Sequence, residues 1–362
     1  MKKITSMILA LVFAVSLIGT ASAKTLKIQL TFPKTSYDGQ IVKMWTDRVT
    51  QLTRGELVFE LLSKGEVVGM KETLEAVDKG LVDGGAAWTH YWSNYHPAAM
   101  LFGSPVAGGG IGLSTKSWLA WYFDNGGKEL YDRLWNEMGM NVKGFVMASS
   151  GPEALGWFKE PIKNMDDFRK YRFRTPPGIP GQTYKDIGIA SVSLSGGDIL
   201  PALEKGTIDA AEWCCPKPDS VFGFQKVLKN YYLQGLHQNV VNGDIYINGD
   251  VYNSLTDHQK YAMEVASEAM ITRNITNRAV ENGKALIDLT ENHGVKLWDT
   301  PADYFTEYMN AAQATLKKNA ASNAFFKEVY EHMTAHAKIV VPFIAQMETS
   351  DASIGTAFAK QQ

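Results

Sequence analysis

The chain has 362 residues, a length that predicts about two domains. Its composition, with 45% hydrophobic and 20% charged residues, is ordinary for a globular protein. The formal net charge of -2 leaves no basic excess, which argues against nucleic acid as a partner.

The first residues have the pattern of a signal peptide. Lys2 and Lys3 precede an apolar run over 4–18, and residues 21–23 read Ala-Ser-Ala, a small-residue cleavage site. The apolar run is shorter than the roughly 20 residues that a membrane-spanning helix needs. We therefore expect an exported protein and assign residues 1–23 to the signal peptide.

Helical and strand patterns alternate in the next part of the chain. A strand over 26–30, a helix over 40–54 with apolar residues on one face, and a strand over 56–62 predict a βαβ unit. A helix over 70–80 and a strand over 81–84 follow. This alternation predicts an α/β fold.

One short pattern occurs twice. Residues 76–83 read Ala-Val-Asp-Lys-Gly-Leu-Val-Asp, and residues 202–209 read Ala-Leu-Glu-Lys-Gly-Thr-Ile-Asp. Both predict a helix, a glycine stop and a strand. Such units are common in α/β proteins, and the repeat equally fits two like-built lobes that face each other across a cleft.

Polar side chains follow two predicted strands. Glu153 lies in a turn after the strand over 141–148, and Glu212 and Trp213 follow the strand over 207–211. Ligands of open α/β sheets bind outside the carboxyl ends of the strands. These three residues are therefore candidates for a binding site.

A charged strand over 170–174 carries two arginines on one face, Arg172 and Arg174. The guanidinium group can hold a carboxylate or a sulfonate by two parallel hydrogen bonds. We predict that Arg174 is the anion clamp and keep Arg172 as the alternative. A surface salt bridge is the competing interpretation for either.

The chain has two cysteines, Cys214 and Cys215, which are adjacent. Cα atoms of trans neighbours lie about 3.8 Å apart, below the about 4.4–6.8 Å usual for a disulfide. A vicinal disulfide would therefore be strained, although an exported compartment is oxidising. Two such close side chains cannot supply the four ligands of a zinc site alone.

The longest predicted helix covers 257–293. Thr256 and Gln259 have the spacing of a capping box, and Gly294 is a stop signal. At 1.5 Å per residue this helix would span about 50 Å, more than one lobe. Two helices broken near 282–283 are the alternative.

Two further helices, over 304–318 and 325–347, end the predicted structure, and residues after 350 are expected to be loose. His332 and His336 share a helix face. No glutamate follows His332 directly, so the zinc-protease motif is absent and we expect a solvated pair.

The run over 196–216 contains Gly-Gly-Asp, Ala-Leu-Glu-Lys-Gly-Thr-Ile-Asp and Glu-Trp-Cys-Cys-Pro. It resembles the solute-binding proteins of tripartite ATP-independent periplasmic (TRAP) transporters, closest to the branch that binds 2-oxo and 2-hydroxy acids. The resemblance extends to residues 64–69, to Tyr91-Trp92 and to the long helix.

The resemblance implies a periplasmic protein with the α/β, two-lobe solute-binding fold, in which a long helix braces both lobes. The implied organisation is lobe I over 24–147, completed by about 217–256, lobe II over 148–216, the connecting helix over 257–293, and a C-terminal strand and helices over 294–362.

Members of this branch hold a small acid together with a bridging sodium or calcium ion. Carried over to this chain, the resemblance makes Arg174 the clamp and puts Glu153 at a carboxamide position. It makes Glu212 a metal ligand through its side chain and Trp213 a metal ligand through its backbone carbonyl.

Two aromatic residues, Tyr91 and Trp92, follow the first-lobe unit and would enter the cleft from the other side. We expect one of them to close over the ligand. Core packing is the competing interpretation, and it is the stronger one for Trp92.

Glu153 departs from the neutral amide of the family pattern. Two carboxylates aimed at one cavity repel each other, so Glu153 or Glu212 should be protonated, paired with Arg174 or bound to a cation. A second carboxylate favours calcium over sodium, which makes Glu153 a candidate metal ligand as well.

The implied function is capture of a small organic acid anion such as pyruvate or lactate, with hinge closure and delivery to integral-membrane transporter subunits. A small sulfonate such as isethionate is an alternative ligand. The alternative of another class is a glycoside hydrolase that uses Glu153 and Glu212, which requires a separation of about 5–9.5 Å. The neighbouring arginine argues against a raised acid pKa and hence against this enzyme.

A homodimer is one option that the resemblance implies, because some relatives with this C-terminal helical extension form pairs. The apolar residues available for it would equally serve an internal core: Phe325, Phe326, Val329, Tyr330, Ile339, Val340, Val341, Phe343 and Ile344.

Overall fold

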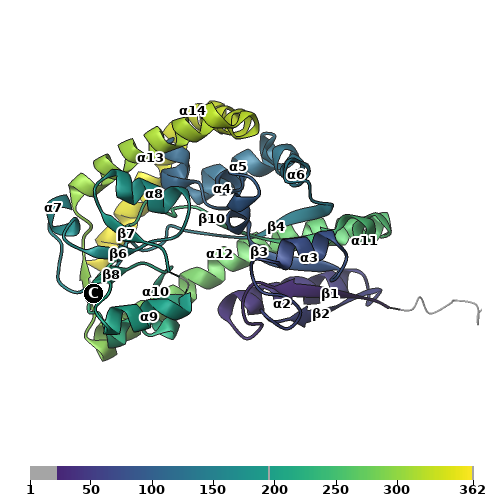
Figure 1. Cartoon of the computed structure of the whole chain (residues 1–362), viewed down its shortest axis with the longest axis horizontal. Coiled ribbons are helices and arrows are strands. Elements are labelled where there is room, and N and C mark those ends of the chain that lie inside the picture. The colour runs from purple at the N-terminus through teal and green to yellow at the C-terminus, as the bar shows by residue number, and fades with distance from the viewer. Residues whose placement is uncertain (1–22, 195, 361–362) are drawn as a thin grey trace, which may run out of the picture.

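The structure is a computed structural model that describes residues 23–194 and 196–360. The predicted signal peptide, 1–23, lies outside the described residues except for Ala23. Two mixed β-sheets with surrounding helices form two lobes, which confirms the predicted α/β, two-lobe fold (Figure 1). None of the helices in the described ranges combines the length and the hydropathy that crossing a membrane requires.

The first sheet has the strand order β2-β1-β3-β10-β4. β1 is parallel to β2 and β3, whereas β10 is antiparallel to β3 and β4. Between β1 and β2 lies α2 (Tyr37–Leu52), whose Trp45 and Val49 are buried against the sheet, as the predicted βαβ unit requires. The strands are β1 (Lys24–Leu30), β2 (Leu57–Leu62), β3 (Gly84–Trp88), β4 (Val142–Ser150) and β10 (Val241–Asn248).

The second sheet has the strand order β11-β9-β5-β8-β6-β7, and its strands are short. The strand predicted over 207–211 shrinks to its last two residues. The amides of Thr207 and Ile208 donate to the carbonyl of Ala202 at 2.9 and 3.4 Å, so they close the preceding helix instead of pairing in the sheet. The strands are β5 (Gly156–Phe158), β6 (Arg172–Arg174), β7 (Ala190–Val192), β8 (Ala210–Ala211), β9 (Asn230–Tyr232) and β11 (Lys296–Trp298).

The repeated sequence pattern has the same backbone conformation in both lobes. Gly80 follows α3 (Thr73–Asp78) with φ 68°, and Gly206 follows α9 (Gly196–Glu204) with φ 66°. Glycine adopts this left-handed conformation without strain. β3 and β8 then begin at the same offset from each glycine.

An aspartate of each repeat makes the same contact. Asp83 accepts a hydrogen bond from the Lys27 amide of β1 at 2.8 Å, and Asp209 accepts one from the Arg172 amide of β6 at 3.3 Å. β1 and β3 are a parallel pair, and so are β6 and β8. The structure therefore favours two like-built lobes over a chance pattern.

The chain passes between the sheets at three places. The β4–β5 connection and the β9–β10 connection are two of them. Within the 217–256 segment, β9 belongs to the second sheet and β10 to the first. The third crossing is a helix.

This helix, α12 (Asp257–His293), is unbroken, so the alternative of two helices is wrong. Both bonds of the predicted Thr256–Gln259 capping box are present, at 3.1 and 3.2 Å, and Gly294 ends the helix with φ 62°. α12 packs against β4 and α2 of the first lobe and against α10 of the second. It braces both lobes, as Figure 1 shows.

The C-terminal helices are α13 (Ala302–Ser322) and α14 (Ala324–Ala359). The prediction of loose residues after 350 is wrong, because α14 continues as an exposed helix through Ala359. The prediction of a solvated histidine pair is wrong for His336 only, because His332 is exposed. His336 is buried with its Nε2 3.0 Å from the Ser117 carbonyl, and His332 accepts a 2.9 Å hydrogen bond from the Trp121 indole.

The other helices lie around the sheets. α5 and α6 carry a tightly packed aromatic cluster over the first sheet, in which Trp118 stacks on Tyr122. The bounds are η1 (Thr89–Asn94), α4 (Ala99–Gly103), η2 (Val106–Gly110), α5 (Thr115–Asp124), α6 (Gly127–Glu137), α7 (Met165–Phe168), α8 (Ile179–Asp186), α10 (Pro216–Phe222), η3 (Phe224–Lys226) and α11 (Gly249–Asn253).

Candidate ligand-binding site

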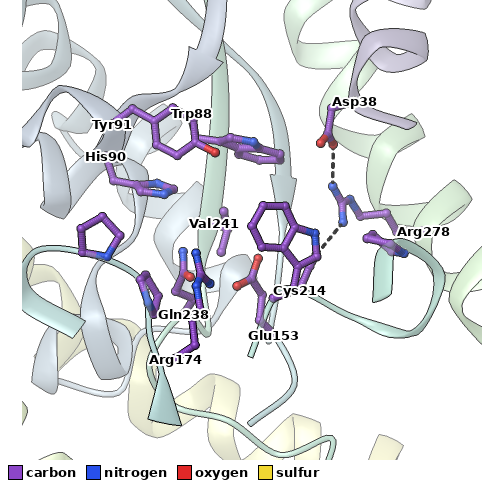
Figure 2. A pocket seen from close by; sticks show the side chains of 14 residues that line it. Asp38, Trp88, His90, Tyr91, Glu153, Arg174, Cys214, Gln238, Val241 and Arg278 are labelled. Atoms are coloured by element: carbon purple, nitrogen blue, oxygen red, sulfur yellow. Dashed lines mark hydrogen bonds and ion pairs between the residues drawn. The ribbon is translucent and has the colours of Figure 1, made fainter. Parts of the chain in front are cut away.

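A cavity of about 110 Å³ lies between the lobes and is lined by both of them and by α12 (Figure 2). The loop after β3 forms one wall and the loop after β8 another, so the two repeats end at the same cavity. The lining residues are Asp38, Trp88, His90, Tyr91, Glu153, Arg174, Pro176, Pro177, Trp213, Cys214, Pro218, Gln238, Val241 and Arg278.

Arg174 reaches this cavity from the end of β6 and is almost fully buried. Its Nε and Nη2 donate to the Leu194 carbonyl at 3.1 and 3.0 Å, and its Nη1 donates to the backbone carbonyl and to Oε1 of Glu212. These bonds use four of its five N–H groups. Within the described part of the chain, one N–H on Nη2 is left for a ligand.

Glu212 is fully buried beside this guanidinium. Burial by itself raises the pKa of Glu212, but the nearby Arg174 and His237 outweigh it and hold the pKa below its usual value. Glu212 is therefore an ionised partner of Arg174. The Trp213 ring lies over the same guanidinium, 5.3 Å from its central carbon.

Three buried polar atoms converge beside this pair without a hydrogen-bond partner in the described chain: Glu153 Oε2, Glu212 Oε2 and His237 Nε2. One ligand atom from each of these residues lies within 4.8 Å of the others. Glu212 Oε2 and His237 Nε2 are 3.5 Å apart, too far for a good hydrogen bond. Burial, then Cys214 and then Glu212, raise the pKa of Glu153 well above its usual value.

Unpartnered buried carboxylate oxygens are costly, and a bound cation would satisfy them. Carboxylates are the ligands that calcium prefers, and the imidazole adds a nitrogen. His237 Nδ1 lies 3.2 Å from the Tyr184 hydroxyl, the kind of outer contact that orients a metal-ligating imidazole. The residues present therefore fit a metal ion.

The other predicted site residues separate into those at the cavity and those away from it. Tyr91 lines the cavity, and burial raises its pKa, so its hydroxyl keeps the proton that it can donate. Trp92 is only 1% exposed and packs edge-on against Tyr95 and Tyr246, so it belongs to the core.

Arg172 does not reach the cavity. Its guanidinium makes two 2.8 Å hydrogen bonds to Asp209 on the outside of the sheet, and its side chain is 49% exposed. Here the competing interpretation, a surface salt bridge, is the correct one. Alternation along the strand places both arginines on the same face of β6. Only Arg174 reaches the cavity, because it lies at the carboxyl end of the strand, whereas Arg172 lies at its start.

Several residues in or beside the cavity were not predicted. Trp88 ends β3 and His90 follows it, much as Glu212 and Trp213 follow β8, so the same rule could have found them. Burial lowers the pKa of His90 to about 4, which leaves it neutral. His237, Gln238 and Arg278 carry no local signal, because connections and a long helix bring them in from far along the chain.

Arg278 is the second guanidinium at the cavity. It comes from the middle of α12, is 7% exposed, and its Nη2 lies 3.1 Å from Asp38 Oδ1. Its ring contacts are Tyr37 at 4.9 Å and Trp88 at 5.8 Å. Arg278 is thus paired with one carboxylate, that of Asp38. Arg174, in contrast, lies beside two carboxyl groups, those of Glu212 and Glu153.

Comparisons with known proteins agree with this geometry. The chain is 32% identical over 298 residues to a monocarboxylate 2-oxoacid-binding periplasmic protein of Nostoc sp. (strain PCC 7120), covering 80% of this chain and 78% of the relative.

Among solved structures, a TRAP transporter solute-binding protein from Bordetella bronchiseptica RB50, a dimer with copurified calcium and picolinate, matches with TM-score 0.85 and 25% identity over 94% of this chain and 99% of that one. A TRAP periplasmic solute-binding protein from Colwellia psychrerythraea with calcium and pyruvate matches with TM-score 0.84 and 22% identity over 92% and 99%. One from Pseudoalteromonas atlantica T6c with sodium and pyruvate matches with TM-score 0.82 and 21% identity over 92% and 99%. The last two likenesses concern the fold.

The family model described as bacterial extracellular solute-binding protein, family 7, matches residues 30–323, which is most of the chain. With two like-built lobes, a cavity between them and a relative of the same kind, the chain belongs to family 7 of the bacterial extracellular solute-binding proteins.

Proposed function

We propose that this protein captures a small 2-oxo acid anion, such as pyruvate, together with a calcium ion in the periplasm, and delivers it to the membrane subunits of a TRAP transporter. The observation that carries the proposal is that Arg174 and Glu153 line the interlobe cavity and that the buried Glu212 pairs with Arg174 and lies close to Glu153. Relatives with known ligands support it, since those named above bind 2-oxo acids or are solved with calcium or sodium and a small acid.

Each residue has a distinct part in the proposed complex. Arg174 donates its remaining N–H to the carboxylate of the acid, and Tyr91 donates from the opposite wall to a second oxygen. The side chains of Glu153 and Glu212 and the backbone carbonyl of Trp213 would hold the metal ion, and His237, which clusters with both glutamates, would add a nitrogen ligand. When bound, the ion supplies positive charge to the oxygens of the acid.

Charge balance favours a divalent ion over sodium. With a cation in place of the proton on Glu153, one guanidinium and two ionised carboxylates would carry one net negative charge. A divalent cation converts this to one net positive charge, which a monocarboxylate neutralises, whereas sodium leaves the cluster neutral before the acid binds. Buried charge has to be compensated, so calcium with a monoanion is the favoured pair.

The glycoside hydrolase alternative does not hold. The family is a solute-binding one, and Glu212 is fully buried and paired with Arg174, so it cannot serve as a solvent-side base or nucleophile. Capture of a small acid requires only a cavity such as this one of about 110 Å³, and not a groove that would hold a sugar chain.

The test is calorimetry with chelator-treated protein. Pyruvate should bind with calcium present and lose most of its affinity without any cation, while sodium should restore less affinity than calcium. Lactate and isethionate are titrated in parallel. Full affinity for pyruvate without a cation, or tighter binding of isethionate, would contradict the proposal.

We also infer that a second copy of this chain covers the exposed face of α14. Phe325, Phe326 and Val329 are buried inside the protein, so the internal core uses one part of the predicted apolar set. Large apolar side chains remain exposed at helical spacing further along, and one relative is a dimer. These are Ile339, Phe343, Met347, Ile354 and Phe358.

Light scattering tests this pairing. The wild type should have the mass of a dimer, and Phe343→Glu should have the mass of a monomer, while the control Lys338→Glu on the same helix should stay dimeric. A monomeric wild type at micromolar concentration would contradict it.

A further inference from the structure

The two cysteines lie side by side at the ligand cavity. Their sulfur atoms are 3.1 Å apart and both thiols are free. Cys214 lines the ligand cavity, and both cysteines line a neighbouring cavity of about 250 Å³ that shares Glu153 and Arg278 with the first. Cys214 is partly exposed and Cys215 is 8% exposed. A small reagent that enters either cavity can therefore reach a thiol.

Their surroundings differ from those of a structural cysteine in an apolar core. Arg278 Nη1 lies 3.5 Å from each sulfur, and Figure 2 shows its side chain directed at Cys214. The guanidinium therefore contacts both sulfur atoms at the edge of the ligand cavity. Arg278 is held in position by Asp38 at 3.1 Å, so this contact is fixed by the fold.

The backbone connects the cysteines to the proposed ligand groups. The Cys214 carbonyl accepts a 2.8 Å hydrogen bond from the Ala154 amide, next to Glu153. The Cys214 amide donates to Asp219 at 3.0 Å, and Cys214 follows Trp213 directly. Closing a ring between adjacent cysteines twists the peptide between them, because their Cα atoms are closer than an unstrained disulfide allows. This twist moves the Cys214 carbonyl and with it the support of Glu153.

We propose that Cys214 and Cys215 form a reversible vicinal disulfide, and that its formation lowers the affinity of the adjacent site for its ligand. The second half of this proposal rests on the proposed function. The strain of such a bond makes it easy to reduce, as is typical of regulatory rather than structural disulfides.

The reaction is thiol–disulfide exchange with an external disulfide. The more accessible Cys214 sulfur attacks a sulfur of the oxidant, forms a mixed disulfide and releases one thiol. The Cys215 sulfur then displaces the remaining half of the oxidant as a second thiol. The two cysteines lose two protons and two electrons, and the oxidant gains both.

The first measurement is independent of any ligand. The full chain is treated with oxidised glutathione or with a phosphine reductant, and intact mass and hydrogen exchange of the segment around Ala154 are compared. We expect the oxidised protein to lack two hydrogens and to exchange this segment faster, with full reversal by the reductant. An unchanged mass, or unchanged exchange despite the disulfide, would overturn the proposal.

The second measurement is calorimetry of both forms with pyruvate and calcium. Oxidation should weaken binding by about 10-fold or more, the loss typical when groups that support metal ligands are disturbed. The double variant Cys214→Ser/Cys215→Ser is the matched control, and the same oxidant should not change its affinity. Affinities of oxidised and reduced wild type within about twofold would refute the coupling. If the reduced protein binds no acid at all, the proposed function fails, and hydrogen exchange alone decides the redox proposal.

Discussion

The two lobes contain the same helix–glycine–strand unit, but one matching position in the neighbouring strand is Gln29 in the first lobe and Arg174 in the second. Lys27 and Arg172 both donate an amide to the aspartate of their repeat, so the residues two further along, Gln29 and Arg174, also correspond. Gln29 Nε2 donates to the Ser63 carbonyl just past β2 at 2.8 Å, and Arg174 donates to the Leu194 carbonyl just past β7.

An uncharged amide therefore satisfies the structural need at this position. The guanidinium of Arg174 goes beyond that need, since it also reaches Glu212 and the cavity. A buried charge is expensive, and the lobe without a ligand contact at this position does without it. The difference between the lobes thus separates what the fold requires from what binding requires.

The largest loss of stability and binding is expected for Arg174→Gln, which introduces the residue found at the matching position of the first lobe, Gln29. Arg174→Gln keeps a donor for the Leu194 carbonyl but leaves Glu212 buried without its cation. Loss of one partner of a buried pair costs about 3–5 kcal/mol of unfolding free energy. Pyruvate binding should disappear, as measured by calorimetry on protein shown to be folded by circular dichroism.

Retained affinity in Arg174→Gln would mean that the guanidinium only serves the fold, and the comparison of the lobes would lose its functional meaning. Gln29→Glu is not a suitable control, because it adds a charge. Gln29→Met is the matched one, and it should lower stability while pyruvate still binds.

A second comparison concerns one buried aspartate in each lobe. Asp244 of the first lobe accepts hydrogen bonds from Thr89 and Tyr131 at 2.8 Å, and Asp219 of the second is held by three donors. Burial raises the pKa of each to about 7. The folded state then keeps a proton that the unfolded chain, with a pKa near 3.8, releases.

Because the folded pKa is raised, stability is full below about pH 4 and falls as the pH rises toward 7, by about 1.4 kcal/mol per pH unit for each group. Urea unfolding at pH 5 and pH 7 measures this slope. Asp244→Asn should remove the contribution of the first lobe only. An equal slope in wild type and variant would show that Asp244 is ionised in the folded protein at both pH values.

Glu153→Gln tests the proposal that the site prefers calcium over sodium. It introduces the neutral amide that the resemblance implies at this position. Loss of one carboxylate should lower calcium affinity by about 10- to 100-fold or more, and sodium should become the comparable partner. Calorimetry of pyruvate in each ion measures this. An unchanged preference for calcium would remove Glu153 from the metal site.

The smallest effect is expected for Arg172→Gln, two residues from the clamp. Its partner Asp209 is on the surface, where such pairs contribute about 0.2–1 kcal/mol. Pyruvate affinity should stay the same, which makes this variant the control for Arg174→Gln. A loss of binding here would mean that β6 as a whole, and not the clamp, controls affinity.

The sequence was sufficient where the signals are local. Caps and stops predicted the bounds of α12, and the Lys-Gly repeat made two matching lobes one of two interpretations. Strand ends predicted Glu153, Glu212 and Trp213, and the family pattern selected Arg174. The lengths of short strands were not predictable, because Thr207 and Ile208 close a helix instead.

Contacts between distant segments were the part that sequence reasoning missed. Nothing local marks Arg278 within a helix of 37 residues, or His237 and Gln238 within a connection. Trp92 was ambiguous for the same reason, since its neighbour Tyr246 is far along the chain. Only the folded arrangement distinguishes a cavity aromatic from a core aromatic.

The three chain crossings have a mechanical consequence. Each contributes one residue to the cavity wall: Glu153 in the β4–β5 connection, Gln238 in the β9–β10 connection and Arg278 in α12. Any rotation of one lobe against the other must therefore displace these groups relative to Arg174. A partner that changes the angle between the lobes would therefore disturb the ligand groups without contacting the ligand.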